Sequence, residues 1–555
     1  MMNKSRSRIR KFGRLEIPLT IIGFSILILM IGCGGGSSND DPNNPPPVMV
    51  TVDWQINVDI STARIPVKSA LIGHYDLSGT LYNYGAVSGL KDSMSQVGFN
   101  LDGGESSDWR LGLGRWEIGT ELFDTLTDGS ECPIILTGSE SQFANDLDLI
   151  ASRDWFTFTD GMPVSLLGIN DSRYSLDYIR SSLDVANDFG ASPFVSIDIM
   201  PRALSVNQTP NRVNCGASFT NSISNNQPVD PLVFASAVSG LVSRIVEGSG
   251  DKLGEQRPRK AQYWEVWNEP EFYLFWEPDL ATDPDAFFDM AVATLQQLAD
   301  YRAVSVVPEV QSLKFGLGSF AIENTAITVI EGFDPANIPL DFISFHQYND
   351  DPLVIVDAIA AVKTTLENSV NYKNVELVLA EWGPDLDSRV ADQQYAMSMD
   401  AALHASTVIL LGAQVGLDRS HKALFYNYFP EIALGLIDND GQPRPLYRAY
   451  EMMAKIMDSN KERFVLSNVN GGRLDTGMGA VMVTRDQSSG TQRALFVNRN
   501  STSRVARIAF DGSNARPLEL FVLDASDNPV NPLRSIAVTA DEFNVPAESL
   551  VLVVF

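Results

Sequence analysis

The sequence predicts an α/β fold, a (β/α)8 TIM barrel followed by a C-terminal antiparallel β-sandwich. Within residues 70–458, eight short apolar runs alternate with amphipathic helical segments, which is the pattern of a barrel of buried parallel strands. Within residues 459–555, the apolar residues recur at every second position, in short runs separated by Gly, Asn, Asp and Pro. That spacing is typical of an antiparallel sandwich. An open doubly wound sheet is the alternative, but no Gly-rich phosphate turn follows the first run.

The expected barrel strands are the apolar runs, and an amphipathic helix follows each of them. The runs cover residues 70–77, 109–118, 193–200, 263–267, 313–319, 341–348, 375–381 and 423–428. The helices cover about 87–97, 175–189, 231–246, 285–303, 325–331, 353–367, 392–411 and 446–457. Two long irregular stretches, 119–171 and 201–229, follow the second and third strands. We expect both to form large loops at the carboxyl end of the barrel.

The segment 48–69 precedes the barrel and contains a strand of a different kind. From Val48 to Ile60 every even position is apolar, and every odd position except Met49 is polar. This alternation predicts a half-buried strand with one wet face. We expect it to pair with the sandwich rather than to join the barrel.

The N-terminus, residues 1–32, has the pattern of a bacterial lipoprotein signal peptide. A basic region precedes a short apolar run that begins at Ile17, as in signal peptides. The run ends in Met-Ile-Gly-Cys, which resembles a lipobox and implies cleavage and lipidation at Cys33. Residues 33–47 are rich in Gly, Ser, Asn and Pro, as a flexible tether would be. We therefore expect a protein of the bacterial cell envelope, lipid-anchored in a membrane. An ordinary signal peptide or an uncleaved anchor is the alternative.

The composition limits the classes of partner. A formal net charge of −28 at pH 7 repels nucleic acid and disfavours a strongly polyanionic substrate. The four His are scattered, and neither an HExxH motif nor a metal-binding Cys pair is present, so we expect no metal site. No phosphate-binding glycine loop occurs between a strand and a helix. We therefore expect no cofactor and no nucleic-acid partner.

Two glutamates end buried strands of the predicted barrel. The fourth strand ends in Asn268-Glu269-Pro270, and the proline stops it because it cannot extend the pairing ladder. The seventh strand ends in Glu381, followed by Trp382. The carboxyl ends of all strands in such a barrel face one mouth, so both carboxyl groups are expected there. Two unrelated capping or salt-bridged glutamates are the alternative.

A pair of carboxyl groups at one mouth is the requirement for cutting a glycosidic bond. One carboxyl group protonates the leaving oxygen, and the other stabilises or traps the sugar carbon as positive charge develops. The first must be held protonated while the second stays ionised, and their surroundings can arrange both. The pattern therefore predicts a glycosidase.

The same segments resemble clan A glycoside hydrolases, most closely family 39, which includes β-xylosidases, α-L-iduronidases and exopolysaccharide hydrolases. The resemblance begins at Trp267-Asn268-Glu269-Pro270 with Phe275-Trp276. It extends to the strands 193–204 and 341–348 and to the segment 435–450. It covers roughly residues 190–460, and a trailing sandwich is usual in the family.

The resemblance assigns roles by position. Glu269 would be the general acid/base and Glu381 the nucleophile of a retaining mechanism, while Asn268 would bind the sugar 2-hydroxyl. The remaining predicted contacts to a carbohydrate substrate are His346, Tyr348, Trp382, Trp276, Tyr426 and His74. Tyr348 would also hydrogen-bond Glu381, and the aromatic residues would be sugar platforms. Core packing is the alternative for each aromatic residue, and a hydrogen-bonded core position is the alternative for His74.

Three departures from the family pattern concern the substrate. Ala380 precedes the nucleophile where Thr is usual, strand eight offers Tyr or Phe where Trp is usual, and the early strands match poorly.

Cys132 and Cys215 lie in the long stretches after strands two and three, which emerge side by side. We expect a disulfide between them because disulfides persist in exported proteins. Free buried thiols are the alternative.

Two rival functions remain open. The first is another clan A activity, such as an endo-glycanase with an open cleft built by the loops 119–171 and 201–229. The second is a glycan-binding surface lipoprotein without turnover, which would fit a chain lacking one of the two glutamates. Because both glutamates are present, the sequence favours a retaining glycoside hydrolase that acts on a poly- or oligosaccharide at the cell envelope.

Overall fold

The fold is taken from a computed structural model. It describes residues 51–62, 64–77, 108–112, 117–118, 158–159, 162–163, 174–175, 183–184, 186–187, 191–197, 200–201, 223–224, 226–228, 230–247, 258–272, 275–277, 280, 284–389, 392–423, 433–438, 440–457, 461–466, 469, 472–538 and 540–555. Residues 51–555 form one compact unit. The predicted signal peptide (1–32) and tether (33–47) lie outside the described residues. Within these ranges, no helix has the length and apolarity to cross a membrane.

Eight parallel strands, counted over the described ranges, pair in one closed order. Their bounds are β3 (Gly73–Leu77), β4 (Asp108–Gly112), β9 (Ser192–Ile197), β12 (Tyr263–Val266), β13 (Lys314–Phe320), β14 (Phe342–Tyr348), β15 (Glu376–Gly383) and β16 (Arg419–Ala423). The order runs β12, β13, β14, β15, β16, β3, β4, β9 and returns to β12. Seven of the eight expected apolar runs therefore coincide with parallel strands, and the eighth strand lies at a different place.

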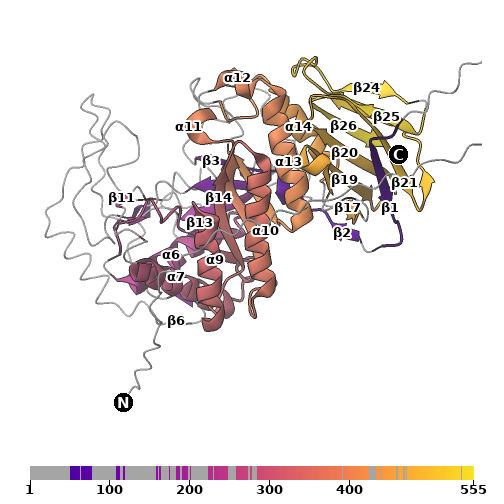
Figure 1. The fold of residues 1–555 in the computed structure, drawn as a ribbon. Coiled ribbons are helices and arrows are strands. Elements are labelled where there is room, and N and C mark those ends of the chain that lie inside the picture. Colours follow the sequence, from indigo (N-terminus) through magenta and orange to yellow (C-terminus); the bar gives the residue numbers. More distant parts are fainter. Residues whose placement is uncertain are drawn as a thin grey trace, which may run out of the picture. The chain divides into compact units, whose positions relative to one another are not determined.

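Helices follow the later strands at the predicted places. Their bounds are α6 (Pro231–Val246), α7 (Pro284–Val304), α8 (Pro308–Gln311), α9 (Glu323–Phe333), η5 (Asp334–Ala336), α10 (Pro352–Asn368), α11 (Leu386–Arg389), α12 (Gln393–Ala396), α13 (Met399–Val415) and α14 (Pro445–Ala454). Figure 1 shows α9 and α10 alongside the strands β13 and β14. The sequence sets these boundaries: Asp351 caps α10 ahead of Pro352, and Gly416 ends α13 with a φ of 98°.

Three strand boundaries differ from the prediction. Residues 69–72 form a short 3-10 helix (η1), so β3 begins only at Gly73. The second strand ends at Gly112, and β5 (Glu117–Ile118) pairs instead with β8 (Tyr174–Ser175). The eighth strand is Arg419–Ala423 rather than 423–428. The strand was not predicted because its first four residues, Arg-Ser-His-Lys, are polar. In the structure, its last four residues are buried, and the strand lies between two neighbouring strands.

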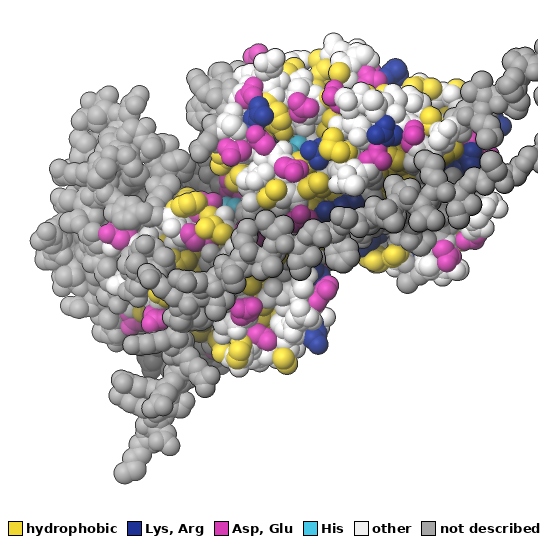
Figure 2. Space-filling view, in the orientation of Figure 1, with side chains coloured by type: hydrophobic (Ala, Val, Ile, Leu, Met, Phe, Trp, Pro, Cys, Tyr) yellow, Lys and Arg dark blue, Asp and Glu magenta, His cyan; other side chains and the backbone are white. Residues whose placement is uncertain are grey.

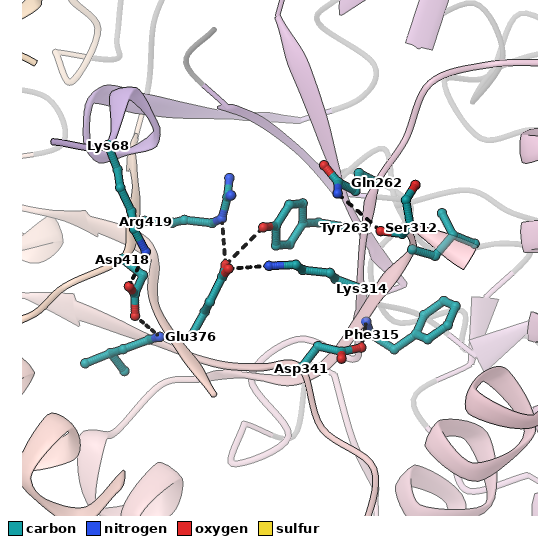
Figure 3. Close-up of polar contacts among 12 residues, drawn as sticks. Lys68, Gln262, Tyr263, Ser312, Lys314, Phe315, Asp341, Glu376, Asp418 and Arg419 are labelled. Atoms are coloured by element: carbon teal, nitrogen blue, oxygen red, sulfur yellow. Dashed lines mark hydrogen bonds and ion pairs between the residues drawn. The ribbon is translucent and has the colours of Figure 1, made fainter. Parts of the chain in front are cut away.

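A charged cluster lies at the amino ends of four barrel strands. The Glu376 carboxylate accepts hydrogen bonds from the hydroxyl of Tyr263 (3.0 Å) and from Nε of Arg419 (3.0 Å), and it pairs with Lys314 (Figure 3). Burial raises the pKa of Glu376, but the charges of Arg419 and Lys314 outweigh burial and bring the pKa to about 2. The cluster ties strands together at the end of the barrel opposite the expected chemistry.

The described residues of the C-terminal β domain form two sheets. One has the order β2–β17–β19–β20–β26–β23–β24, with β18 paired to β19; the other has β1–β21–β22, with β25 paired to β21. The bounds are β1 (Trp54–Val58), β2 (Arg64–Pro66), β17 (Lys461–Phe464), β18 (Arg473–Leu474), β19 (Gly479–Asp486), β20 (Gln492–Asn498), β21 (Arg504–Phe510), β22 (Ser513–Asn514), β23 (Glu519–Leu523), β24 (Arg534–Ala537), β25 (Glu542–Val545) and β26 (Ser549–Val554). The N-terminal strand β1 joins this domain, but it runs parallel to β21. No hairpin links the two strands, so their direction is free.

The central strands β19, β20 and β26 of the larger sheet are buried on both faces, and their side chains alternate between two cores. Met482 and Leu495 belong to the core that the barrel and its helices share, whereas Val481 and Phe496 belong to the core of the β domain. Arg448 of α14 also donates to the carbonyl oxygen of Pro529 at 2.7 Å. The two-residue period of a strand produces this division. The β domain and the barrel therefore share a packed boundary.

The surface carries charges of both signs. Figure 2 shows acidic side chains interspersed with Lys, Arg and apolar side chains over the described part of one face. Acidic side chains are frequent on this face, as the composition predicts, but basic side chains lie among them, so the face does not carry charge of one sign only.

Candidate active site

The paired glutamates lie at the carboxyl ends of two strands, β12 and β15, that are separated by β13 and β14. Glu269 follows β12, Glu381 lies near the end of β15, and β14 between them contributes His346 and Tyr348. Each glutamate side chain is 18% exposed. The predicted convergence of two partly accessible carboxyl groups at one barrel end is therefore present.

The backbone at Glu269 is unusual. Trp267 and Glu269 have φ values of 76° and 40°, a region that L-residues seldom adopt. The amide of Glu269 donates to the carbonyl oxygen of Ser319 at the end of β13 (2.8 Å), and Ser319 itself has a φ of 51°. Backbone strain of this kind often marks functional sites because the surrounding structure must hold it. Here it turns Glu269 out of the strand direction.

His346 lies between the two carboxyl groups. Its Nδ1 is 2.8 Å from Oε1 of Glu269, and its Nε2 is 4.0 Å from Oε2 of Glu381. The ring is 1% exposed, and Nε2 has no hydrogen-bond partner among the described residues. In register, His346 stands opposite Glu381, immediately after an irregularity in the pairing of β14 with β15. One buried imidazole thus contacts the acid/base candidate on one side and faces the nucleophile candidate on the other.

The hydroxyl of Tyr348 donates to Oε1 of Glu381, as expected from the resemblance. Tyr348 stands opposite Gly383 in the β14–β15 register. A donor at this place fixes the rotation of the Glu381 carboxylate and leaves its other oxygen toward His346. Asn268 is 7% exposed and sits directly before Glu269.

Two charged residues near the site escaped the sequence analysis. Lys422 of β16 is 2% exposed, and burial lowers the pKa of its ammonium group to about 7. Glu271 accepts from the amide of Ala321 (3.2 Å), and burial raises its pKa. In the sequence, Lys422 is a lysine within a strand, and Glu271 is a second glutamate two residues after Glu269. Neither pattern distinguishes a site residue from a surface one.

The tryptophans have core positions. Trp276 is fully buried and packs edge-to-face against Trp267 and Phe287, so it offers no face to a sugar. This corrects its assignment as a platform in favour of core packing. Trp382 is also fully buried and stacks on His404 of α13, with ring centroids 6.5 Å apart. As arranged, its role is to pack the end of β15 against the helix.

Several predicted residues lie where the structure gives no side-chain account. His74 is placed by its backbone alone, in β3 opposite Lys422 and Trp109. Tyr426, Cys33, Cys132 and Cys215 lie outside the described residues. Among the residues that are described, no group of three or more His, Cys, Asp or Glu is arranged to hold a metal ion.

The parallel strands and the two carboxyl groups at their carboxyl ends are the features to compare with known proteins. A family model described as Glycosyl hydrolases family 39 matches residues 159–495, which is more than half of the chain. The chain belongs to this family. The family membership inferred from the Asn-Glu-Pro strand is thereby confirmed.

Relatives and solved structures agree with this membership. A "Beta-xylosidase" of Caldicellulosiruptor saccharolyticus is 24% identical over 309 residues, which are 51% of this chain and 57% of that relative. The match thus spans little more than half of the relative's length. A monomeric beta-xylosidase from Caulobacter crescentus CB15 superposes with a TM-score of 0.58 at 15% identity, over 90% of this chain and 99% of that one. A family 39 enzyme from Xanthomonas axonopodis pv. citri has a TM-score of 0.57 at 17% identity, with coverages of 92% and 99%. At these identities the structural likeness concerns the fold.

Proposed function

We propose that this chain hydrolyses glycosidic bonds of an oligo- or polysaccharide with retention of configuration at the sugar carbon. Glu381 is the nucleophile and Glu269 the general acid/base. The observation that carries the proposal is His346, a single buried ring that contacts Glu269 and faces Glu381 4.0 Å away. Two carboxyl groups separated by one imidazole are near enough to act on the same bond.

The proposed mechanism has two steps. Glu269 first protonates the leaving oxygen while a carboxylate oxygen of Glu381 attacks the sugar carbon, giving a covalent glycosyl-enzyme. Water then attacks that carbon and gives a proton to Glu269. The bond between the sugar carbon and Glu381 breaks, and its electron pair returns to the Glu381 carboxylate. Tyr348 donates to Oε1 of Glu381, and the other carboxylate oxygen, Oε2, faces His346. Asn268 binds the sugar 2-hydroxyl, an interaction that strengthens in the transition state.

β-Xylosides are the first substrate class to test, because the curated relative carries the name "Beta-xylosidase". The loops 119–171 and 201–229 determine the remaining specificity. An endo-glycanase activity is the alternative within the same mechanism. It predicts faster cleavage of long polysaccharides than of aryl glycosides, whereas a β-xylosidase prefers short substrates.

The test compares Glu381→Ala and Glu269→Ala with the wild type on aryl glycosides that differ in leaving group. We expect Glu381→Ala to abolish turnover, and Glu269→Ala to spare only substrates whose leaving groups need no proton. Glu367→Ala, which changes an exposed glutamate of α10, is the matched control. NMR of the first-formed product reports the configuration. Full activity of Glu381→Ala, or an inverted product, contradicts the proposal, and ligand binding without product would favour the non-catalytic alternative.

For the architecture, we propose a (β/α)8 barrel followed by a β-sandwich formed by the two C-terminal sheets. The closed strand order of the barrel supports the first part. A single core cluster that draws Ile56 and Ile508 from the smaller sheet and Val481 and Val553 from the larger one supports the second. The proposed boundaries are 70–458 for the barrel and 459–555 with the strand segment 48–69 for the sandwich.

We also propose that the enzyme is a lipoprotein of the bacterial cell envelope, anchored through Cys33 after removal of residues 1–32. Supporting this are the basic region, the apolar run and the lipobox-like Met-Ile-Gly-Cys. Cys33→Ala should abolish incorporation of labelled fatty acid and release the protein from the membrane fraction. Labelling that survives in Cys33→Ala contradicts the anchor.

A disulfide between Cys132 and Cys215 belongs to the same proposal, because the exported compartment is oxidising. Mass spectrometry after alkylation without reductant tests it. Two alkylated cysteines at these positions would contradict the disulfide.

A further inference from the structure

We propose that Glu265 and Ser344 are positioning residues for the general acid/base. Through Ser319 they hold the backbone of Glu269 in the conformation that places its carboxyl group at the barrel mouth. This inference rests on the proposed function, which makes Glu269 the acid/base. It assigns a role to a fully buried carboxyl group, four residues before Glu269, that the two-glutamate mechanism does not use.

Glu265 lies in the interior of the barrel, beneath the mouth. Its neighbours along β12, Trp264 and Val266, belong to the core shared by the barrel and its helices, whereas Tyr263 belongs to a separate interior cluster. The two-residue period of a strand places Glu265 on the same side as Tyr263. Large aliphatic side chains usually fill such an interior, and a carboxyl group there costs free energy unless hydrogen bonds compensate it. A glutamate that is 0% exposed at this place therefore requires polar partners.

One such partner is Ser344 of β14, which is also 0% exposed. Its hydroxyl donates to Oε1 of Glu265, and its oxygen accepts from the amide of Ser319 at 2.8 Å. A carboxylate can only accept hydrogen bonds, so Glu265 directs the hydroxyl hydrogen toward itself and leaves a lone pair of Ser344 for the Ser319 amide. Along β14, Ser344 lies on the same side as His346, two residues later. The pair therefore lies one layer below the site.

Ser344 stands opposite a β-bulge on β13. The register of β13 with β14 shifts between Leu317 and Phe320, so Gly318 and Ser319 together oppose Ser344. A β-carbon built on Gly318 would lie 2.2 Å from the carbonyl oxygen of Ser344, so the two strands are in close contact here. Bulges beside active sites often redirect a side chain. The hydrogen bond from Ser319 to Ser344 fixes this bulge.

The bulge in turn holds the backbone of Glu269. The carbonyl oxygen of Ser319 accepts from the amide of Glu269 at 2.8 Å. Both residues have a left-handed backbone, with φ values of 51° and 40°, and such a conformation persists only where the surrounding structure holds it. Two serines on neighbouring strands thus connect the buried Glu265 to Glu269. Loss of a link frees the bulge, and Glu269 then departs from the place at which it protonates the leaving oxygen.

The experiment uses dinitrophenyl and phenyl glycosides of the sugar that the wild type hydrolyses. The dinitrophenyl group leaves without a proton, whereas the phenyl group needs one, so the ratio of the two kcat/KM values reports on the acid. Ser344→Ala should lower kcat/KM about 10- to 100-fold on the phenyl glycoside, the effect of a misplaced catalytic group, and keep it near the wild-type value on the dinitrophenyl glycoside. Glu265→Leu should show the same pattern. Glu265→Gln keeps an oxygen that accepts from the Ser344 hydroxyl, so it should recover most of the loss.

A double variant tests whether the two residues act through one chain of contacts. Glu265→Leu combined with Ser344→Ala should be no slower on the phenyl glycoside than the slower single variant, because residues of one hydrogen-bond network are not independent. Losses that multiply would overturn the inference, since Glu265 would then act by a route that does not include Ser344.

Ser420→Ala is the matched control. Ser420 is a fully buried serine of the barrel strand β16, and its hydroxyl donates to the carbonyl oxygen of Leu71, outside this chain of contacts. It should keep the wild-type ratio of the two kcat/KM values. The inference is overturned if Ser344→Ala keeps that ratio, or if Ser420→Ala changes it equally. If one of the single variants Ser344→Ala and Glu265→Leu does not fold, the other decides by the same ratio.

Glu269→Ala in the same assay separates this inference from the proposed function. An equal loss of kcat/KM on both glycosides in Glu269→Ala would refute the proposed role of Glu269. A selective loss on the phenyl glycoside in Glu269→Ala, together with an unchanged ratio in Ser344→Ala, would overturn the inference alone.

Discussion

Nδ1 of His346 lies 2.8 Å from Oε1 of Glu269. An ionised carboxylate can only accept a hydrogen bond, so Nδ1 carries the hydrogen whenever Glu269 is ionised. In the neutral ring Nε2 is then an acceptor without a partner in the described structure, directed toward Glu381. The ring thus fixes the position of the acid/base candidate from β14, one of the two strands between the glutamate-bearing strands.

The first prediction concerns His346→Phe, which keeps a ring but removes the hydrogen bond to Glu269. We expect kcat/KM to fall about 10- to 100-fold, as for the loss of a hydrogen bond to a charged group. The fall should be largest for poor leaving groups, because they depend most on protonation by Glu269. A series of aryl glycosides with graded leaving groups measures it. An equal fall across the series would mean that His346 acts on something other than the acid.

The second prediction concerns Tyr348→Phe, which removes the donor to Glu381. We expect kcat/KM to fall about 10- to 100-fold for all leaving groups, because the nucleophile loses its orientation in the first step. Tyr372→Phe is the control: its hydroxyl donates to the carbonyl oxygen of Ile338 at 2.8 Å, away from the site. That variant should lose some thermal stability and keep kcat/KM. Activity retained in Tyr348→Phe would show that the contact is only structural.

The strands that carry the pair could be predicted because they obey simple rules. Glu269 and Glu381 each follow a mostly apolar run, and parallel topology brings such strand ends together. His346 and Tyr348 followed from the resemblance to a family. Lys422 could not be found this way, because its strand begins with Arg-Ser-His-Lys and is polar in sequence. Its burial arises from neighbours on β15 and β3, and no local pattern contains that information.

The tryptophans illustrate a second limit of sequence reasoning. Trp276 and Trp382 lie beside the catalytic motifs, where an aromatic platform is a reasonable expectation. Both are buried. The expectation was wrong because a position next to the motif in the chain does not determine whether a side chain points toward the barrel mouth or into the core. Periodicity alone cannot separate a sugar platform from a core residue when the turn is irregular. The backbone at Trp267 and Glu269 is irregular in this way.

The third prediction concerns Gly318 at the end of β13. Its φ is 153°, and an added β-carbon would lie 2.2 Å from the carbonyl oxygen of Ser344. Gly318→Ala should cost about 1–3 kcal/mol of unfolding free energy through overpacking. It should also lower kcat/KM, since the next residue, Ser319, accepts the Glu269 amide. Gly332→Ala in α9 is the control, because nothing lies within 4 Å of its added β-carbon. Chemical denaturation and kinetics measure both; equal stability of the two variants would contradict the steric argument.

The fourth prediction concerns the cluster at the amino end of the barrel. Glu376→Gln leaves Arg419 and Lys314 without their shared carboxylate. We expect a loss of about 3 kcal/mol in the free energy of unfolding at neutral pH. kcat/KM should stay near the wild-type value because the cluster is at the far end of the strands. Glu367→Gln, an exposed glutamate of α10, should change neither quantity.

The pH dependence of the same variant gives the sharper test. The pKa of Glu376 is lowered from an ordinary 4.5 to about 2 in the folded protein. Its stabilising contribution is therefore complete above pH 4.5 and declines as the pH falls toward 2, where the folded protein also binds the proton. Denaturation of the wild type and of Glu376→Gln between pH 6 and pH 2 should show the two curves converging as the pH falls. Curves that stay parallel over this range would mean that the carboxylate charge does not hold the strands together.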